Sequence, residues 1–338
     1  MASPGLLAHI AVSKFCDHLP LYRQENIFKR NGIDLGRGTM SQWMIACGML
    51  LQPIINIAQE KIIEYTVAYA DESRLQVLKQ PDKKRVSLSY MWVFGGGRPE
   101  EFTWIFHYAA GRGSDVPVQF LLDFKGHIHV DAYAGYNALT HEDFVFLVIC
   151  MAHARRKFVE ITKLAKNKHG VAHEVVARMG KLYAIEKMLK EKNTPIDQIK
   201  TIREEKSRPI LNDLKVYLEE KQTSVLSGSL LGKAIHYFLN HFEGLTRYVE
   251  DGRLEIDNNR TERVMKPFAT GRKNWLFCDS VRGAQAAANI YSLIETCKFH
   301  HVNPYLYLKH VFEKINHCTS VEEYEQLLPY RFKELMVT

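Results

Sequence analysis

The chain has 338 residues, with 45 Lys and Arg against 38 Asp and Glu, and therefore a formal net charge of +7. Hydrophobic residues make up 46% and charged residues 25%, which is typical of a soluble globular protein and excludes a disordered chain. No uncharged apolar run reaches the roughly 18 residues of a membrane helix. The first twenty residues lack the basic start and the apolar stretch of a signal peptide. We therefore expect a cytoplasmic protein with no membrane partner.

Residues 1–64 are expected to form a helical N-terminal subdomain. An amphipathic run at 21–30 is stopped at Gly32, and Thr39 or Ser41 is placed to cap the next helix. Two helices joined by a glycine turn resemble a helix-turn-helix, but the pattern is common. A plain helical subdomain is therefore the favoured interpretation.

Strand-forming residues follow. Runs at 65–70, 86–94 and 102–108 are rich in β-branched and aromatic residues. They predict a three-stranded antiparallel meander, with the glycines at 95–97 as turn residues.

The chain beyond the meander changes its pattern. Residues 116–124 suit a short helix, whereas 126–130 and 144–150 read as strands. Because each of these strands is reached through a helix, we expect a mixed α/β sheet.

The positive charge is confined to one segment. Between Met151 and Lys221, 17 Lys and Arg stand against 10 Asp and Glu, whereas the rest of the chain has 28 of each sign. Helical spacing of apolar residues predicts helices here, with breaks at Pro195 and Pro209. The surplus is compatible with an ordinary solvated surface and also with a surface that binds phosphates.

Two aspartates follow predicted strands. Asp71 ends the first strand and Asp131 the fourth, so neighbouring strands would bring both carboxylates to one edge of the sheet. Either residue alone could be a turn former. Together they could hold Mg²⁺, which prefers oxygen ligands.

A third carboxylate is needed to hold two metal ions about 3.5–4 Å apart, as in phosphoryl displacement. Asn258 or Asn259 can cap a helix that has Glu262 in its first turn. This spacing also resembles a capping box, which would give Glu262 a purely structural role. Glu295, inside a later apolar helix, is the rival third ligand, and Glu262 is favoured because it is a lone acid in a basic run.

Other potential metal ligands are weaker. The six cysteines are scattered without a CxxC pair, so we expect reduced thiols and neither disulfides nor a zinc site. Cys150 and His153 provide only two ligands. Trp275 could stack on an unpaired base or belong to the core.

Long stretches of the sequence resemble the DDE transposases of the insertion sequence 66 family. The similarity runs from SPGLLAHIAVSKFCDHLPLYRQE through ADES, HVDAYAGYNAL and CMAHARRKF to LEIDNNRTERVMKPFATGRKNWLF and IYSLIETCK. It covers nearly the whole chain. The resemblance implies a ribonuclease H-like core in which Asp71 and Asp131 are the first and second catalytic acids and Glu262 is the third.

The resemblance also implies a domain organisation. Residues 65–158 would form the first part of the core, 159–250 a basic helical insertion, and 251–338 the rest of the core with the third acid and the C-terminal helices. Ser73 stands where the family usually has Thr. We expect the chain to be a catalytic region that lacks the family's usual N-terminal coiled-coil and zinc-binding region.

The function implied is metal-dependent cleavage of DNA at insertion-sequence ends and strand transfer to target DNA. Two Mg²⁺ ions, replaceable by Mn²⁺, would be bound by the three acids. The enzyme would act as a homo-oligomer on DNA, in the bacterial cytoplasm at the nucleoid. The alternatives are a catalytically silent DNA-binding or inhibitory fragment and a ribonuclease H-like nuclease that cuts without joining. The predicted DNA-binding residues are Arg155, Arg156, Lys157, Arg260, Arg263, Arg272 and Lys273.

Overall fold

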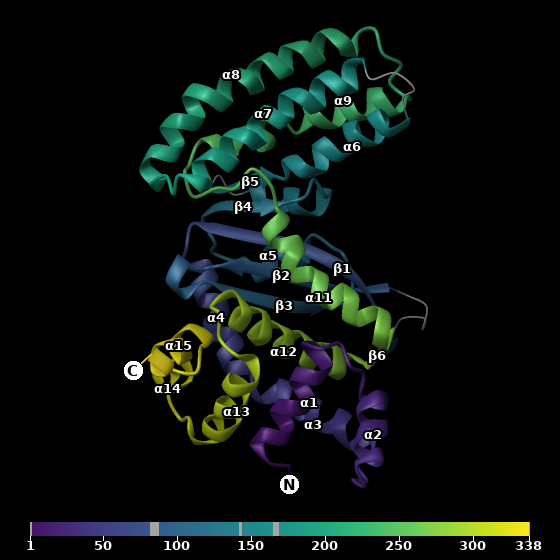
Figure 1. The fold of residues 1–338 in the computed structure, drawn as a ribbon, viewed down its shortest axis with the longest axis vertical. Coiled ribbons are helices and arrows are strands. Elements are labelled where there is room, and N and C mark those ends of the chain that lie inside the picture. Colours follow the sequence, from purple (N-terminus) through teal and green to yellow (C-terminus); the bar gives the residue numbers. More distant parts are fainter. Residues whose placement is uncertain (1, 82–87, 142–143, 165–168, 338) are drawn as a thin grey trace. The chain divides into compact units, whose positions relative to one another are not determined.

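The chain divides into two compact units in the computed structural model (Figure 1). The first unit comprises residues 1–125 and 261–338, and the second comprises residues 126–260. Both contain helices and strands, which confirms the mixed α/β class. The four domains expected from the sequence stay a prediction. The structure describes residues 2–81, 88–141, 144–164 and 169–337.

The described residues of the first unit form four strands and a larger set of helices. Its strands are β1 (Val67–Lys79), β2 (Leu88–Gly96), β3 (Thr103–Ala109) and β6 (Cys278–Ser280). Its N-terminal helices are α1 (Pro4–Phe15), α2 (Leu21–Arg30), α3 (Arg37–Leu50) and α4 (Gln52–Ile63). The later helices are α5 (Asp115–Phe120), α11 (Asn259–Trp275), which begins in the second unit, α12 (Val281–Phe299), α13 (Pro304–Lys314), α14 (Val321–Glu325) and α15 (Pro329–Val337).

Helix α3 begins earlier than the sequence predicted. It starts at Arg37, so Thr39 lies inside the helix and caps nothing at its start. The Arg37 amide donates instead to the Glu25 carboxylate of α2, at 2.8 Å. A side chain from the neighbouring helix has therefore replaced the expected local cap.

The predicted antiparallel meander is confirmed, with two differences. β1 pairs with β2, and β2 with β3, but β1 continues eight residues past Asp71. Only Gly97, with φ +100°, has a turn conformation. Gly95 lies within β2, where a Cβ would come within 2.3 Å of the Trp104 ring, so packing requires a glycine there. Residues 86 and 87, expected at the start of β2, lie outside the described part of the chain.

Helix α12 closes the outer edge of β3 (Figure 1). The backbone amide of Trp104 donates to the Thr296 hydroxyl at 2.9 Å, and that of Phe106 donates to the Ser292 hydroxyl at 2.8 Å. Because Ser292 and Thr296 are four residues apart, they lie on one face of the helix. Their hydroxyls satisfy strand amides that an additional strand would otherwise pair with.

The second unit combines two parallel strands with a bundle of helices. β4 (Gly126–Val130) pairs in parallel with β5 (Val145–Ile149), as predicted. Helices α6, α7, α8 and α9 pack against one another (Figure 1). The helices of this unit are α6 (Met151–Leu164), α7 (Val171–Glu191), α8 (Ile196–Gln222), α9 (Leu230–Asn240) and α10 (Phe242–Thr246).

The predicted helix break at Pro209 is wrong. Pro195 does precede α8, but Pro209 lies inside this helix. Proline removes a backbone hydrogen bond and strains a helix. The face of α8 that includes Leu211, Leu214 and Leu218 is buried, and this packing keeps the helix continuous.

All six cysteines are free thiols, and three of them are buried. Among the described residues, no helix is both long enough and apolar enough to cross a membrane.

Candidate active site

The first predicted acid, Asp71, lies inside β1 and does not end it. Burial changes at this point: Val67–Ala70 are buried, and the following polar residues are partly exposed while the strand continues to pair with β2. Asp71 is paired with Val93, and Val93 with Phe106 of β3. Directly paired residues project from the same face of an antiparallel sheet. The Asp71 side chain therefore shares a sheet face with Phe106.

Helices α11 and α12 cover that face. The Phe106 ring lies 6.2 Å from the ring of Phe268 in α11 and 5.5 Å from that of Tyr291 in α12. Phe268 also packs edge-on against Tyr291. The helix that carries Glu262 therefore lies over the face of the sheet from which Asp71 projects.

The direction of α11 places Glu262 toward Asp71. Arg272 of α11 donates to the Ser73 hydroxyl at 3.1 Å and to the Arg74 carbonyl. The chain after α11 then pairs with β1 at Val77, so α11 runs along β1 in the direction of the strand. Glu262 precedes Arg272 by about 15 Å of helix. It therefore lies on the Asp71 side of Ser73, half-buried in the first turn of α11.

The second predicted acid, Asp131, belongs to the second unit. It follows β4, and its carboxylate accepts the backbone amide of Tyr133 at 2.9 Å. This contact confirms the turn-forming role considered for such a residue. Burial and the nearby charge of Asp131 raise the pKa of Tyr237 in α9. The ammonium group of Lys157 in α6 lies 4.4 Å from the centre of the Tyr237 ring.

The polar segment that precedes Glu262 is fixed to the ends of β4 and β5. The Met151 amide donates to the Ile256 carbonyl at 3.1 Å, and the Asn258 amide donates to the Cys150 sulfur at 3.2 Å. The Glu255 amide donates to Nε2 of His129 at 3.3 Å. Residues 255–258 therefore lie beside the start of α6.

Asp257 organises the start of α11. Its buried carboxylate accepts both the backbone amide of Asn259, at 3.1 Å, and the side-chain amide of Asn259, at 2.6 Å. The sequence predicted a helix capped by Asn258 or Asn259, and the helix does begin at Asn259. The contribution of Asp257 was not predicted; an Asp two residues before the first helical residue is the signal that points to it.

The chain was compared with known protein families and with curated proteins. Residues 1–286 match the family described as "Transposase IS66 family", and residues 292–330 match the "IS66 C-terminal element". The chain belongs to the IS66 transposase family. The resemblance inferred from the sequence is thereby confirmed.

Three relatives from Sinorhizobium fredii (strain NBRC 101917 / NGR234) match almost the whole chain. The protein y4jD is 34% identical over 98% of this chain and 66% of its own length. The protein y4qI is 33% identical over 97% of this chain and 62% of its own length. The protein y4hP is 29% identical over 98% of this chain and 62% of its own length. All three carry the description "Uncharacterized protein". The chain thus spans less than two thirds of the length of these relatives.

The predicted DNA-binding residues of this IS66 family member differ in exposure. Arg156 and Lys157 are exposed on α6, and Arg263 and Lys273 are exposed on α11, whereas Arg155, Arg260 and Arg272 are partly exposed. Several of them contact other groups of the protein: Arg155 lies over the ring of Tyr183, Lys157 over that of Tyr237, Arg260 pairs with Glu255, and Arg272 contacts β1.

Glu295 has a structural partner. Its carboxylate is only 5% exposed and lies 2.7 Å from the ammonium group of Lys298. Burial raises the pKa of Glu295, and the charge of Lys298 opposes the rise. This ion pair inside the first unit gives the rival acid a role that requires no metal.

Sequence reasoning missed a further acid next to Asp71. Glu72 projects from the opposite face of β1, where its side chain is 2% exposed. Nε of Arg112, in the segment that follows β3, donates to this carboxylate at 2.6 Å. Glu72 is therefore neutralised by an internal arginine and holds that segment against the sheet. Glu72 and Arg112 are 40 residues apart in the sequence, so no local sequence pattern predicts their ion pair.

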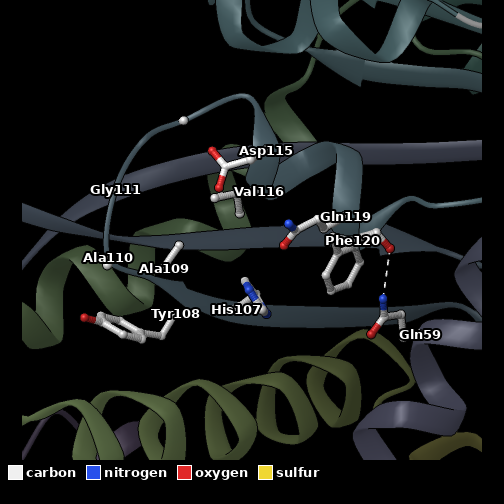
Figure 2. A pocket seen from close by; sticks show the side chains of 11 residues that line it. Gln59, His107, Tyr108, Ala109, Ala110, Gly111, Asp115, Val116, Gln119 and Phe120 are labelled. Carbon is white, nitrogen blue, oxygen red and sulfur yellow. Dashed lines mark hydrogen bonds between the residues drawn. The ribbon is translucent and has the colours of Figure 1, made fainter.

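A hollow of about 340 Å³ lies on this opposite side of the sheet, between β3 and α5 (Figure 2). His107, Asp115 and Gln119 line it, and Gln59 donates to the Phe120 carbonyl at 2.9 Å beside it. Because His107 pairs with Trp92 and Trp92 with Glu72, His107 shares the sheet face of Glu72. The hollow is therefore separate from the face that carries Asp71.

Proposed function

We propose that this IS66 family member is a metal-dependent DDE transposase that cleaves DNA at insertion-sequence ends and joins those ends to target DNA. The observation that carries the proposal is the placement of Asp71 and of the helix bearing Glu262 on one face of the same sheet. Asp131, at the carboxyl end of β4, is proposed to complete the acid set. This assignment requires residues of both units to act together on DNA.

The three carboxylates suit two Mg²⁺ ions, with Mn²⁺ as a substitute. Carboxylate oxygens are the ligands that these hard cations prefer. When bound, such ions lower the pKa of the nucleophile and neutralise the charge that develops at phosphorus. The ion pair of Glu295 with Lys298 supports Glu262 as the third ligand.

The proposed reaction has two steps at one site. In the first, water attacks phosphorus at the element end, the bond from phosphorus to the 3′ oxygen breaks, and a 3′-hydroxyl is left. In the second, that hydroxyl attacks a phosphodiester of the target and displaces its 3′ oxygen. The basic side chains of α6 would position phosphates without reading bases.

The fold supports the same proposal. An antiparallel meander, β1–β3, followed by the parallel strands β4 and β5 is the order expected for a ribonuclease H-like core. We therefore assign the core to that class. We also place the protein in the bacterial cytoplasm, at the nucleoid when bound to DNA, and expect at least a dimer because two DNA ends must be paired.

A strand-transfer assay tests the proposal, with labelled element ends, target DNA and Mg²⁺ or Mn²⁺. We expect Asp71→Asn, Asp131→Asn and Glu262→Gln each to reduce joining about 10³-fold or more, a loss at the upper end of the range for removal of one transition-state stabilising group. Glu295→Gln is the matched control and should keep joining within about threefold.

Three outcomes separate the proposal from its alternatives. Cleavage without joining would identify a nuclease, and DNA binding without either reaction would identify a silent or inhibitory fragment. Loss of joining in Glu295→Gln, with full activity in Glu262→Gln, would transfer the third role to Glu295.

A further inference from the structure

A second hollow, of about 480 Å³, lies between α6 and α7 within the second unit. Its walls combine two arginines, Arg155 and Arg156, with Gly180, the Tyr183 side chain and Asn259. Two small apolar side chains of α6 complete the lining. The volume is within the usual range for a site that holds a small organic ligand. Mixed cationic, aromatic and apolar walls are unlike those of an ordinary gap between helices.

Gly180 has no structural reason to be a glycine. It lies in the middle of the 21-residue helix α7, where glycine is less favourable than alanine. A Cβ at this position would meet no atom within 4 Å, so packing within the protein does not require its absence. Glycine commonly allows a ligand to approach the backbone closely. The missing side chain enlarges the hollow at this wall.

The Tyr183 side chain forms the aromatic part of the lining. Its hydroxyl oxygen is buried and interacts with the Asp257 carboxylate. Buried polar groups in native proteins nearly always have a partner. Burial, then the charge of Asp257 and a hydrogen bond with its carboxylate, raise the pKa of Tyr183. The Asp257 carboxylate therefore helps to fix the Tyr183 side chain in the wall of the hollow.

The cationic side of the hollow selects the class of ligand. The Arg155 guanidinium lies 6.0 Å from the centre of the Tyr183 ring, and Arg156 also lines the hollow. Among the described residues, none that lines the hollow is acidic. The Asn259 side-chain amide, which donates to Asp257, is held in place at the rim. Guanidinium groups bind phosphates, whereas an aromatic ring and apolar walls suit a nucleobase.

We propose that this hollow binds one unpaired nucleotide of DNA, with its phosphate at Arg155 and Arg156 and its base against Gly180 and Tyr183. The inference rests on the proposed function, because an enzyme that opens DNA ends generates unpaired nucleotides. Free phosphate would leave the apolar wall and the tyrosine unused. An acidic peptide would likewise have no use for a base-sized space beside a glycine.

DNA binding by the full chain in EDTA tests this site without any catalytic step. Two labelled duplexes of the same sequence are compared, one blunt and one with a three-nucleotide single-stranded overhang. We expect the overhang duplex to bind at least tenfold more tightly. Gly180→Leu should abolish that preference by filling the hollow, while blunt duplex binding stays unchanged. Ala184→Leu, on the exposed face of the same helix, is the matched control and should keep the preference.

A second measurement on the unaltered protein does not depend on the folding of any variant. An overhang of abasic nucleotides keeps the phosphates and lacks the bases, so it should lose the preference. Deoxyadenosine monophosphate should compete with the overhang, and inorganic phosphate at the same concentration should not. An abasic overhang that binds as tightly as the natural one would overturn the proposal, as would full preference in Gly180→Leu. Competition by an acidic peptide but not by the nucleotide would also overturn it.

These results are distinguishable from failure of the proposed function. If strand transfer proceeds and no overhang preference exists, only the nucleotide site is wrong. If the overhang preference is present and the acid variants retain joining activity, the nucleotide site stands and the catalytic assignment is wrong.

Discussion

The two compact units use their charged residues differently. In the first unit, internal partners hold several charged groups: Glu72 pairs with Arg112, Glu295 pairs with Lys298, and Arg272 contacts β1. In the second unit, one helix keeps its positive charge available. Within the described part of the chain, Arg155 and Lys157 of α6 form no ion pair and lie over aromatic rings. The first unit thus contributes mainly acids to the proposed chemistry, and the second contributes a phosphate-binding surface and one acid.

The same contrast exists inside the basic segment. Helix α6 carries four basic residues and one acid, whereas α7 and α8 together carry ten basic and nine acidic residues. Several charged residues of α7 and α8 form ion pairs, including Arg178 with Glu174 and Arg208 with Glu204. A charge surplus counted along the sequence therefore does not locate a DNA surface. The ion pairs reduce the candidate surface to α6.

The largest effect on folding is expected at Arg203, a buried cation of α8. Its guanidinium lies 2.6 Å from the Glu186 carboxylate and also donates to the carbonyls of Tyr248 and Asp251. Arg203→Ala should lower the free energy of unfolding by about 3 kcal/mol, because the partners are left buried and unpaired. Urea denaturation measures this loss, and DNA affinity of the folded protein should not change.

The matched control for Arg203 is Arg208, five residues later in the same helix. Its pair with Glu204 is partly exposed, so Arg208→Ala should cost less than about 1 kcal/mol. If the two variants lost equal amounts of unfolding free energy, the buried Arg203 would contribute no more to stability than the partly exposed Arg208.

A smaller effect is expected from pH, through His129 in β4. Burial, followed by the charge of Arg260, lowers the pKa of His129 to about 3, against about 6.5 in the unfolded chain. The unfolded chain therefore binds a proton below pH 6.5 that the folded protein does not bind. The contribution of His129 to the free energy of unfolding is therefore fully present above pH 6.5 and decreases as the pH falls below that value. Between pH 7 and pH 5 the loss should be about 2 kcal/mol.

His129→Gln isolates this contribution, because glutamine can still accept the Glu255 amide without gaining a proton. Urea denaturation at pH 7 and pH 5 should show a pH dependence about 2 kcal/mol smaller in the variant. The same pH dependence in both proteins would contradict the assignment of the depressed pKa to His129.

The smallest of these effects concerns DNA affinity. The double variant Arg155→Ala/Lys157→Ala should weaken DNA binding about tenfold at 0.1 M salt. It should also reduce the slope of log Kd against log salt concentration by up to about 1.8, which corresponds to two lost phosphate contacts. Lys187→Ala, whose lysine pairs with Glu191 on α7, should leave the slope unchanged. An unchanged slope in the double variant would show that Arg155 and Lys157 do not contact DNA phosphates and that α6 is an ordinary solvated surface.

The sequence predicted best where local patterns decide the structure. The strand at 126–130 and the meander pairing follow from alternating and β-branched residues, and both are present. The errors occur where a distant partner decides. Polar residues after Asp71 suggested a strand end, yet β2 continues to pair with them. Glu25 caps α3 from another helix, and packing keeps α8 continuous through Pro209.

The candidate site shows the same limit. Asp71, Asp131 and Glu262 could be selected from the sequence because carboxylates near strand ends and in a basic motif are conspicuous. The Arg112 partner of Glu72 and the Lys298 partner of Glu295 give these two acids structural roles. Of these two, the Glu72 pair joins residues 40 positions apart and depends entirely on the fold.

The most direct test is to count the Mn²⁺ ions bound by the full chain in complex with element-end DNA, by electron paramagnetic resonance titration. We predict two ions per active site in the unaltered protein and in Glu295→Gln. Loss of at least one ion is predicted in each of Asp71→Asn, Asp131→Asn and Glu262→Gln, with DNA still bound. Two ions retained in any of these three variants would contradict a metal site built from acids of both units.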